Sequence, residues 1–244
     1  MTDVPLNYVR FVKLHLKNYG IFLGSNELNF DRHRTLIVGG GGSGKTLIAN
    51  ALAKLGPVKG IKAHFNADHP EMSVEVVTKG NRNLVNKYGS VIFLSCEFTE
   101  LPTFNLETPF AGIFSHKNGE VVMTEARTIF HALLSRKPMK NEIYKNLNPV
   151  TMAAGERVCL GYAYSFAIRK VMNLDLPVVL DSPYSRLDPE LRHGVRAFLK
   201  EQPCQQILLG GDYEFKEEDK PHYILDYDYM EGCSRVRKAT CDDR

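Results

Sequence analysis

An uninterrupted run of eight residues, 39–46, constrains this chain more than any other part of its sequence. It reads GGGGSGKT and satisfies the pattern G-x-x-x-x-G-K-[ST]. A strand is predicted just before it and a helix just after it, at 47–55. In such a setting glycine N–H groups can point at phosphates, Lys45 can neutralise the β- and γ-phosphates, and the Thr46 hydroxyl can reach Mg²⁺. The predicted phosphate loop comprises Gly39, Gly40, Gly41, Gly42, Ser43, Gly44, Lys45 and Thr46; the alternative is a flexible glycine turn.

A second ligand for the metal is expected at the end of a neighbouring buried strand. The apolar run 176–180 is followed by Asp181. An Asp at the carboxyl edge of a parallel sheet is placed to hold hydrated Mg²⁺ beside Thr46. We therefore predict Thr46 and Asp181 as magnesium ligands, and Lys45 and Asp181 as catalytic residues. The alternative for Asp181 is a buried helix cap.

The order of the predicted elements indicates an α/β fold, that of a P-loop NTPase with a mostly parallel central sheet. Strands at 73–78 and 90–95 predict an accessory antiparallel layer. An amphipathic helix is predicted at 124–136 with Thr124 as its N-cap, and a long helix at about 155–172.

The segment 11–17 alternates between apolar and basic residues, which predicts a half-buried strand. Its apolar side would hold Val12, Leu14 and Leu16, and its basic side Lys13, His15 and Lys17. The basic side is interpreted either as the solvated face of an edge strand or as a face that contacts phosphates.

Composition leaves the partners open. With 43% apolar and 24% charged residues the chain is an ordinary globular protein, in one large domain or two small lobes. The net charge is only +3, so any DNA contact needs a local patch. The basic tail 235–238 is interpreted as a frayed terminus, with contact to DNA as the alternative. Five cysteines without a CxxC pair and scattered histidines predict reduced thiols and no metal besides magnesium. No export signal or membrane-length apolar run is present, so a cytoplasmic protein without a membrane partner is expected.

Three ordered segments carry a resemblance to a known family. TMAAGER (151–157) opens the long helix, LDSP (180–183) ends the apolar strand, and SRLD (185–188) follows. With KNYGIF and ELNFD ahead of the glycine loop, they resemble ABC-type ATPases of the SMC, RecF and DNA double-strand-break repair group. The form D-[ST]-P-x-x-R-L-D is most similar to the ATPases of DNA phosphorothioation and anti-phage defence systems. The coiled-coil arms of the relatives are expected to be absent, because 101–148 is short and contains three prolines.

The resemblance implies an ABC ATPase head in three parts. These are an N-terminal lobe at 1–100 with the phosphate loop, a short helical insertion or lid at 101–148, and a C-terminal lobe at 149–244. It also implies that two copies, or this chain and a related head, pair around Mg²⁺ and ATP. The residues that would complete the partner's ATP site are Ala153, Gly155 and Glu156, with Asp188 at the seam. DNA and an effector or nuclease are implied as further partners, in DNA repair or anti-phage defence.

The sequence departs from the family's pattern at four places. Ser182 stands where a Glu usually polarises the attacking water, and Ala153 stands where a Ser usually touches the γ-phosphate. The switch histidine and the metal-sensing glutamine have no counterpart. Asp212 or Glu214 is the candidate substitute for the water-positioning group.

Two functions from different classes therefore remain. The chain is either an ATPase with degenerate catalytic motifs, or a hydrolysis-deficient assembly switch or regulatory subunit. A small P-loop kinase is a weaker third alternative, because 152–157 and 181–188 have no role in one.

Overall fold

The computed structural model of the chain describes residues 7–54, 69–79, 93–95, 116–134, 152–215 and 219–240. Contacts divide the chain into two compact units. Unit 1 comprises residues 1–95, 175–183 and 203–244, and unit 2 comprises residues 96–174 and 184–202. The three parts predicted from the sequence, 1–100, 101–148 and 149–244, have other boundaries than these units and stay a prediction. Most of the expected insertion at 101–148 lies outside the described residues.

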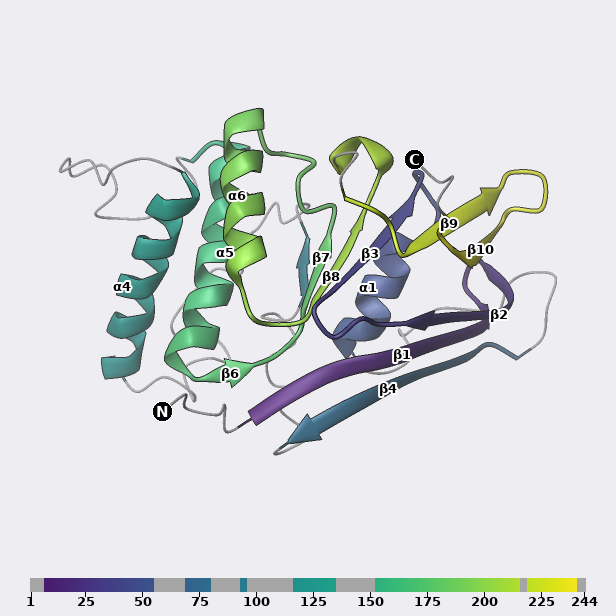
Figure 1. The fold of residues 1–244 in the computed structure, drawn as a ribbon, viewed down its shortest axis with the longest axis horizontal. Helices are drawn as coiled ribbons and strands as arrows, with labels where there is room; N and C mark the ends of the chain where they lie inside the picture. The colour runs from purple at the N-terminus through teal and green to yellow at the C-terminus, as the bar shows by residue number, and fades with distance from the viewer. Residues whose placement is uncertain are drawn as a thin grey trace. The chain divides into compact units, whose positions relative to one another are not determined.

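Unit 1 is built on a mixed sheet (Figure 1). Its elements are β1 (Asn7–Tyr19), β2 (Phe22–Asn29), β3 (Arg34–Gly39), α1 (Lys45–Lys54), β4 (Glu71–Lys79), β5 (Phe93–Ser95), β7 (Val178–Asp181), β8 (Gln206–Gly210), the 3₁₀ turn η3 (Asp212–Glu214), β9 (Tyr223–Asp228) and β10 (Cys233–Lys238). The strand order is β4-β1-β2-β10-β9-β3-β8-β7-β5, and the short strand β6 (Leu174–Asp175) pairs with β1.

Strands β9, β3, β8, β7 and β5 run parallel to one another. Strand β1 is antiparallel to β2 and β4, and β10 is antiparallel to β9. The predicted α/β fold with a mostly parallel sheet is therefore confirmed. One detail is wrong, because β5, expected in the antiparallel layer, pairs in parallel with β7.

The centre of this sheet is buried on both faces. In β3 every residue from Thr35 to Gly39 is buried, and in β7 all four residues are. Helix α1 packs against β3, β7 and β8. Continuous burial is typical of parallel strands covered by helices, and it holds the carboxyl ends of these strands in fixed positions. The phosphate loop begins at the carboxyl end of β3, and Asp181 is the last residue of β7.

Strand β1 differs from its prediction in phase. Phe11 is buried, Val12 is 39% exposed, and Leu14 and Leu16 are buried. The register with β4 shifts between Phe11 and Lys13, so Val12 lies in a bulge that moves the buried side from odd to even positions. The prediction that Val12 shares a face with Leu14 and Leu16 is wrong, because simple alternation does not anticipate an extra residue.

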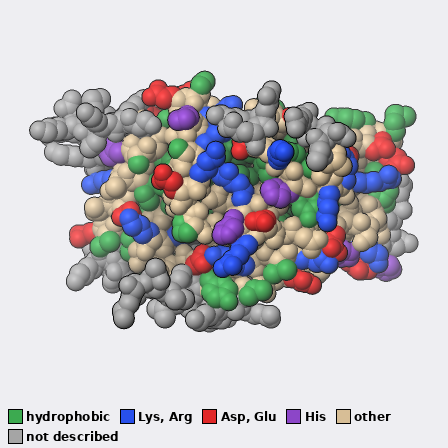
Figure 2. Space-filling view, in the orientation of Figure 1, with side chains coloured by type: hydrophobic (Ala, Val, Ile, Leu, Met, Phe, Trp, Pro, Cys, Tyr) green, Lys and Arg blue, Asp and Glu red, His purple; other side chains and the backbone are tan. Residues whose placement is uncertain are grey.

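The basic side of β1 is compensated by carboxylates on its neighbours. Lys13 lies 2.7 Å from Glu27 of β2, and Lys17 lies 2.9 Å from Glu71 of β4. Because β1 lies between these two strands, the edge-strand interpretation is wrong. Figure 2 likewise shows Lys and Arg side chains interspersed with Asp and Glu on the face that it presents.

Unit 2 is helical in its described part. Its helices α4 (His116–Leu133), α5 (Ala154–Val171) and α6 (Pro189–Glu201) pack against one another. Phe166 of α5 meets Phe198 of α6 edge to face, with 5.0 Å between ring centroids. The predicted N-cap is wrong: Thr124 lies inside α4, and its hydroxyl donates to the Glu120 carbonyl. Helix α4 begins at His116 instead.

None of the helices in the described ranges is long and apolar enough to cross a membrane.

Candidate nucleotide-binding site

The predicted phosphate loop joins β3 to α1, and its glycines are needed for its shape. Gly42 and Gly44 have φ angles of +75° and +96°, in the region that favours glycine. A Cβ at Gly39 would lie 2.4 Å from Ser43 Oγ, and one at Gly44 would lie 2.7 Å from the Phe22 ring. Neighbouring side chains therefore leave no room for a larger residue at Gly39 or Gly44, whereas a Cβ at Gly40 or Gly41 would meet nothing within 4 Å.

The two predicted magnesium ligands touch each other. Asp181 ends β7 and is 5% exposed, and Thr46 lies in the first turn of α1. The Thr46 hydroxyl donates a hydrogen bond of 2.6 Å to Asp181 Oδ2. This hydroxyl and carboxylate fit Mg²⁺, which usually takes only one or two protein oxygens and fills its other positions with water and phosphate oxygens. Within the described ranges, no group of three or more His, Cys, Asp or Glu could hold a metal.

The Lys45 ammonium lies over the start of the loop. Its Nζ donates to the carbonyl oxygens of the first two loop glycines, each at 2.6 Å. Burial lowers the pKa of Lys45, while the charges of Asp181, Glu214 and Asp212 raise it in that order. These two bonds join the cation to neutral carbonyls, so phosphate oxygens could replace the carbonyls as its partners.

Strand β10 supports the loop, which the sequence analysis did not anticipate. Ser234 is fully buried, its hydroxyl donates to the Ser43 carbonyl at 2.9 Å, and its N–H donates to the Ile21 carbonyl at 2.7 Å. One residue thus ties the phosphate loop to the β1–β2 turn. The alternation of residues in 223–228 and 233–238, separated by a glycine-containing turn, was the signal for this hairpin.

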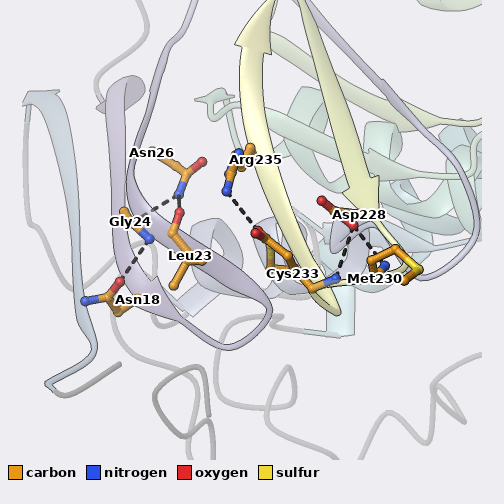
Figure 3. Close-up of polar contacts among 9 residues, drawn as sticks. Asn18, Leu23, Gly24, Asn26, Asp228, Met230, Cys233 and Arg235 are labelled. Atoms are coloured by element: carbon orange, nitrogen blue, oxygen red, sulfur yellow. Dashed lines mark hydrogen bonds and ion pairs between the residues drawn. The ribbon is translucent and has the colours of Figure 1, made fainter. Parts of the chain in front are cut away.

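The turns on both sides of this support are closed by local hydrogen bonds (Figure 3). These join Asn18 to Gly24, Asn26 to Leu23 and Gly24, and Asp228 to Met230. Arg235 pairs with Glu231 at 2.9 Å, and Arg237 pairs with Asp226. The basic residues 235–238 therefore belong to β10, and their interpretation as a frayed terminus is wrong.

The signature residues of unit 2 form the start of α5. Ala153 is its N-cap residue, and Glu156 Oε2 accepts a hydrogen bond of 3.1 Å from the Ala153 N–H. A Cβ at Gly155 would lie 3.0 Å from Leu191 Cδ1 and 3.2 Å from the Arg186 carbonyl oxygen. Gly155 thus permits the close approach of α5 to the segment that leads into α6. The roles of these residues toward a partner's nucleotide stay a prediction.

Asp188, predicted at the seam between copies, caps a helix. It is the N-cap of α6, and its Oδ1 accepts from the Leu191 N–H at 2.8 Å. Arg192, one turn into α6, donates to the carbonyls of Tyr184 and Leu187 and so holds the segment before the cap. The exposed position of Asp188 leaves the seam prediction open.

Two other positions have structural roles as well. Ser182, at the usual Glu position, has a φ of +51°, and its N–H donates to the Leu209 carbonyl at 2.7 Å.

Gln205, just before β8, is buried, and its Nε2 donates to the carbonyls of Phe11 and Asp31, both at 2.8 Å. Gln205 therefore joins β1 to the segment before β3.

Comparison with known proteins gives one family model that matches an N-terminal segment and solved structures that match the fold. Residues 13–54 match a family model described as an AAA domain. No curated protein sequence matches the chain.

Three solved structures share the fold. The SMC head domain from Thermotoga maritima has 15% sequence identity and a TM-score of 0.57, over 95% of this chain and 99% of that one. An SMC head bound to the C-winged-helix domain of ScpA has 17% identity and a TM-score of 0.64, over 95% of this chain and 98% of that one. An SMC head with an extended coiled coil, bound to the C-terminal domain of ScpA derived from Pyrococcus furiosus, has 14% identity and a TM-score of 0.58, covering 95% and 96%.

The fold and the loop between β3 and α1 together define a P-loop NTPase fold. Within that class, the chain has the fold of an SMC head domain.

Proposed function

We propose that this chain is an ABC-type ATPase head that binds ATP with Mg²⁺ and pairs around the nucleotide with a second copy or a related head. The observation that carries the proposal is the 2.6 Å contact between Thr46 and Asp181, next to a lysine that already lies on the loop. When bound, Mg²⁺ would neutralise charge on the β- and γ-phosphates. Thr46 and Asp181 would hold that ion, and Lys45 would bind the same phosphates.

The lysine gives the sharpest test. Lys45→Ala should weaken ATP binding by at least about 100-fold, because it removes two charge-assisted contacts of about 1.5 kcal/mol each. Lys17→Ala is the matched control, since it removes an exposed lysine from the same unit. Titration calorimetry with ATP and Mg²⁺ measures both variants. Equal ATP affinity of Lys45→Ala and wild type would refute the assignment.

Pairing around ATP is tested by mass. The chain weighs 27.6 kDa, so light scattering after size exclusion should give twice that mass with a non-hydrolysable ATP analogue and Mg²⁺. The pairing proposal rests on the resemblance of 151–157 and 185–188 to SMC and RecF-type heads. A mass that stays at one copy, with no related head bound, would contradict it.

A second function, that of a hydrolysis-deficient switch, is favoured by one observation. Ser182 occupies the usual position of the catalytic Glu, and a hydroxyl is a poor base. In this alternative ATP binding orders an assembly without being consumed. ATP turnover no higher than that of Lys45→Ala, combined with tight ATP binding, would decide for the switch.

The biological role that we propose is DNA repair or anti-phage DNA defence, and it rests on the same motif resemblance. Measuring ATP turnover with and without duplex DNA tests it. Stimulation by DNA is expected, and identical rates in both conditions would count against a role on DNA.

A further inference from the structure

The turn after β8 starts between the two halves of the candidate site. In the sheet register Gly210 pairs with Val38, the residue before the phosphate loop, and Leu209 pairs with Asp181 on the other side. The chain that leaves β8 at Gly210 therefore emerges between the loop and the predicted magnesium carboxylate. It continues through Gly211 into η3, which ends at Glu214.

The side chain of Glu214 folds back onto the start of this turn. Its Oε1 accepts a hydrogen bond of 3.1 Å from the Gly211 N–H, and the residue is fully buried. A Cβ at Gly210 would lie 3.1 Å from the same Oε1 and 2.6 Å from the Phe215 ring. Gly210 thus provides the space that this carboxylate occupies at the end of β8.

The carboxylate of Glu214 lies at the end of β8. In the sheet β8 lies between β3, which leads into the phosphate loop, and β7, which ends at Asp181. Asp212 itself is exposed at the start of η3, whereas Glu214 is held away from bulk solvent. A buried carboxylate with little access to bulk water is suited to act as a general base.

We propose that Glu214 is the catalytic base of this chain and takes the place of the glutamate that Ser182 replaces. The proposal rests on the proposed function, since it needs ATP at the phosphate loop. In the step, the water oxygen bonds to the γ-phosphorus while its proton passes to the Glu214 carboxylate. The bond from that phosphorus to the β–γ bridging oxygen breaks, its electron pair stays on that oxygen, and ADP and phosphate result.

A purely structural role for Glu214 makes a different prediction, which the glutamine variant separates. The side-chain oxygen of Glu214→Gln can still accept the Gly211 N–H, so the turn should keep its shape. Only the ability to take a proton is lost. Asp226→Asn is the matched control, because it removes an exposed carboxylate of the same unit that has no part in the candidate site.

The experiment measures ATP turnover, ATP affinity and thermal melting of the full chain for wild type and both variants. Glu214→Gln should lower turnover at least 100-fold, with ATP affinity within about threefold of wild type and an unchanged melting temperature. Asp226→Asn should stay within about threefold of wild type in turnover and ATP affinity, with an unchanged melting temperature. Turnover of Glu214→Gln within threefold of wild type would overturn the proposal.

Two further outcomes are distinguishable. If wild type binds ATP tightly but turns over no faster than Lys45→Ala, the base proposal fails and ATP binding stands. If Glu214→Gln does not fold, Glu214→Asp retains a carboxylate but shortens its reach by one methylene. Its turnover should then fall at least tenfold at unchanged ATP affinity, and an undiminished rate would overturn the proposal.

Discussion

Units 1 and 2 each contain some of the predicted motif residues, but the motif side chains make different kinds of contact in the two units. In unit 1 the motif side chains meet at one place, with Thr46 on Asp181 and Lys45 on the loop carbonyls. In unit 2 they form helix ends, with Glu156 bonded to the Ala153 N–H and Asp188 capping α6. Substitutions of motif residues in unit 1 should therefore change nucleotide affinity but not stability. Those in unit 2 should change stability but not nucleotide affinity.

The largest expected effect is that of Asp181→Asn in unit 1. The amide oxygen can still accept the Thr46 hydroxyl, but it brings no negative charge to a magnesium ion. We expect ATP affinity in Mg²⁺ to fall about 100-fold, a loss of about 2.7 kcal/mol, while affinity measured in chelator changes little.

Titration calorimetry in Mg²⁺ and in chelator measures this difference, and Thr46→Ser, which retains a hydroxyl, is the matched control. An equal loss under both conditions would show that Asp181 acts on the loop itself and not through the ion.

The elements of unit 1 that could be predicted from the sequence are those with a strong local pattern. The glycine loop and the apolar strand ending at Asp181 lie where the sequence placed them because burial of β3 and β7 dominates their conformation. The bulge at Val12 could not be predicted, since it depends on pairing with β4, which is far away in the sequence. The support from Ser234 is non-local in the same way, because it joins residues 191 positions apart.

In unit 2 the prediction failed at a helix end. Thr124 fits an N-cap by residue type, yet the helix continues for eight residues before it, through a glycine at position 119. Packing of α4 against α5 outweighs the local preference of threonine for a cap. The capping role of Asp188 could have been predicted, because Pro189 follows it at the first helical position.

The next largest effect is expected from Gly155→Ala in unit 2. The added Cβ would lie 3.0 Å from Leu191 Cδ1 and 3.2 Å from the Arg186 carbonyl oxygen, so these neighbours must give way by a few tenths of an ångström. We expect the free energy of unfolding to fall by about 2 kcal/mol, with unchanged ATP affinity. Urea unfolding measures the change. Gly40→Ala is the control for stability, because a Cβ at Gly40 meets nothing within 4 Å; equal stability of the two variants would contradict the packing role.

A smaller effect is expected at Asp188. Asp188→Ala removes the N-cap of α6 and should cost about 1 kcal/mol in the free energy of unfolding, whereas Asp188→Asn keeps a capping oxygen and should cost less. Light scattering with an ATP analogue then separates the cap from the predicted seam. If Asp188→Asn is stable but no longer pairs, Asp188 acts at the seam as well; if it pairs like wild type, its role is confined to its own chain.

The smallest effect is expected on the basic side of β1, where neither nucleotide affinity nor stability should respond. Lys13 pairs with Glu27 and Lys17 with Glu71, so a neighbouring carboxylate offsets the charge of each lysine and weakens its attraction to DNA phosphates. The double variant Lys13→Gln with Lys17→Gln should therefore keep both its duplex affinity, within about twofold, and the slope of log affinity against log salt. Each phosphate contact contributes about one unit to that slope. A slope reduced by about two would show that this side exchanges its carboxylate partners for phosphates, and it would make unit 1 a DNA-binding unit as well as a nucleotide-binding one.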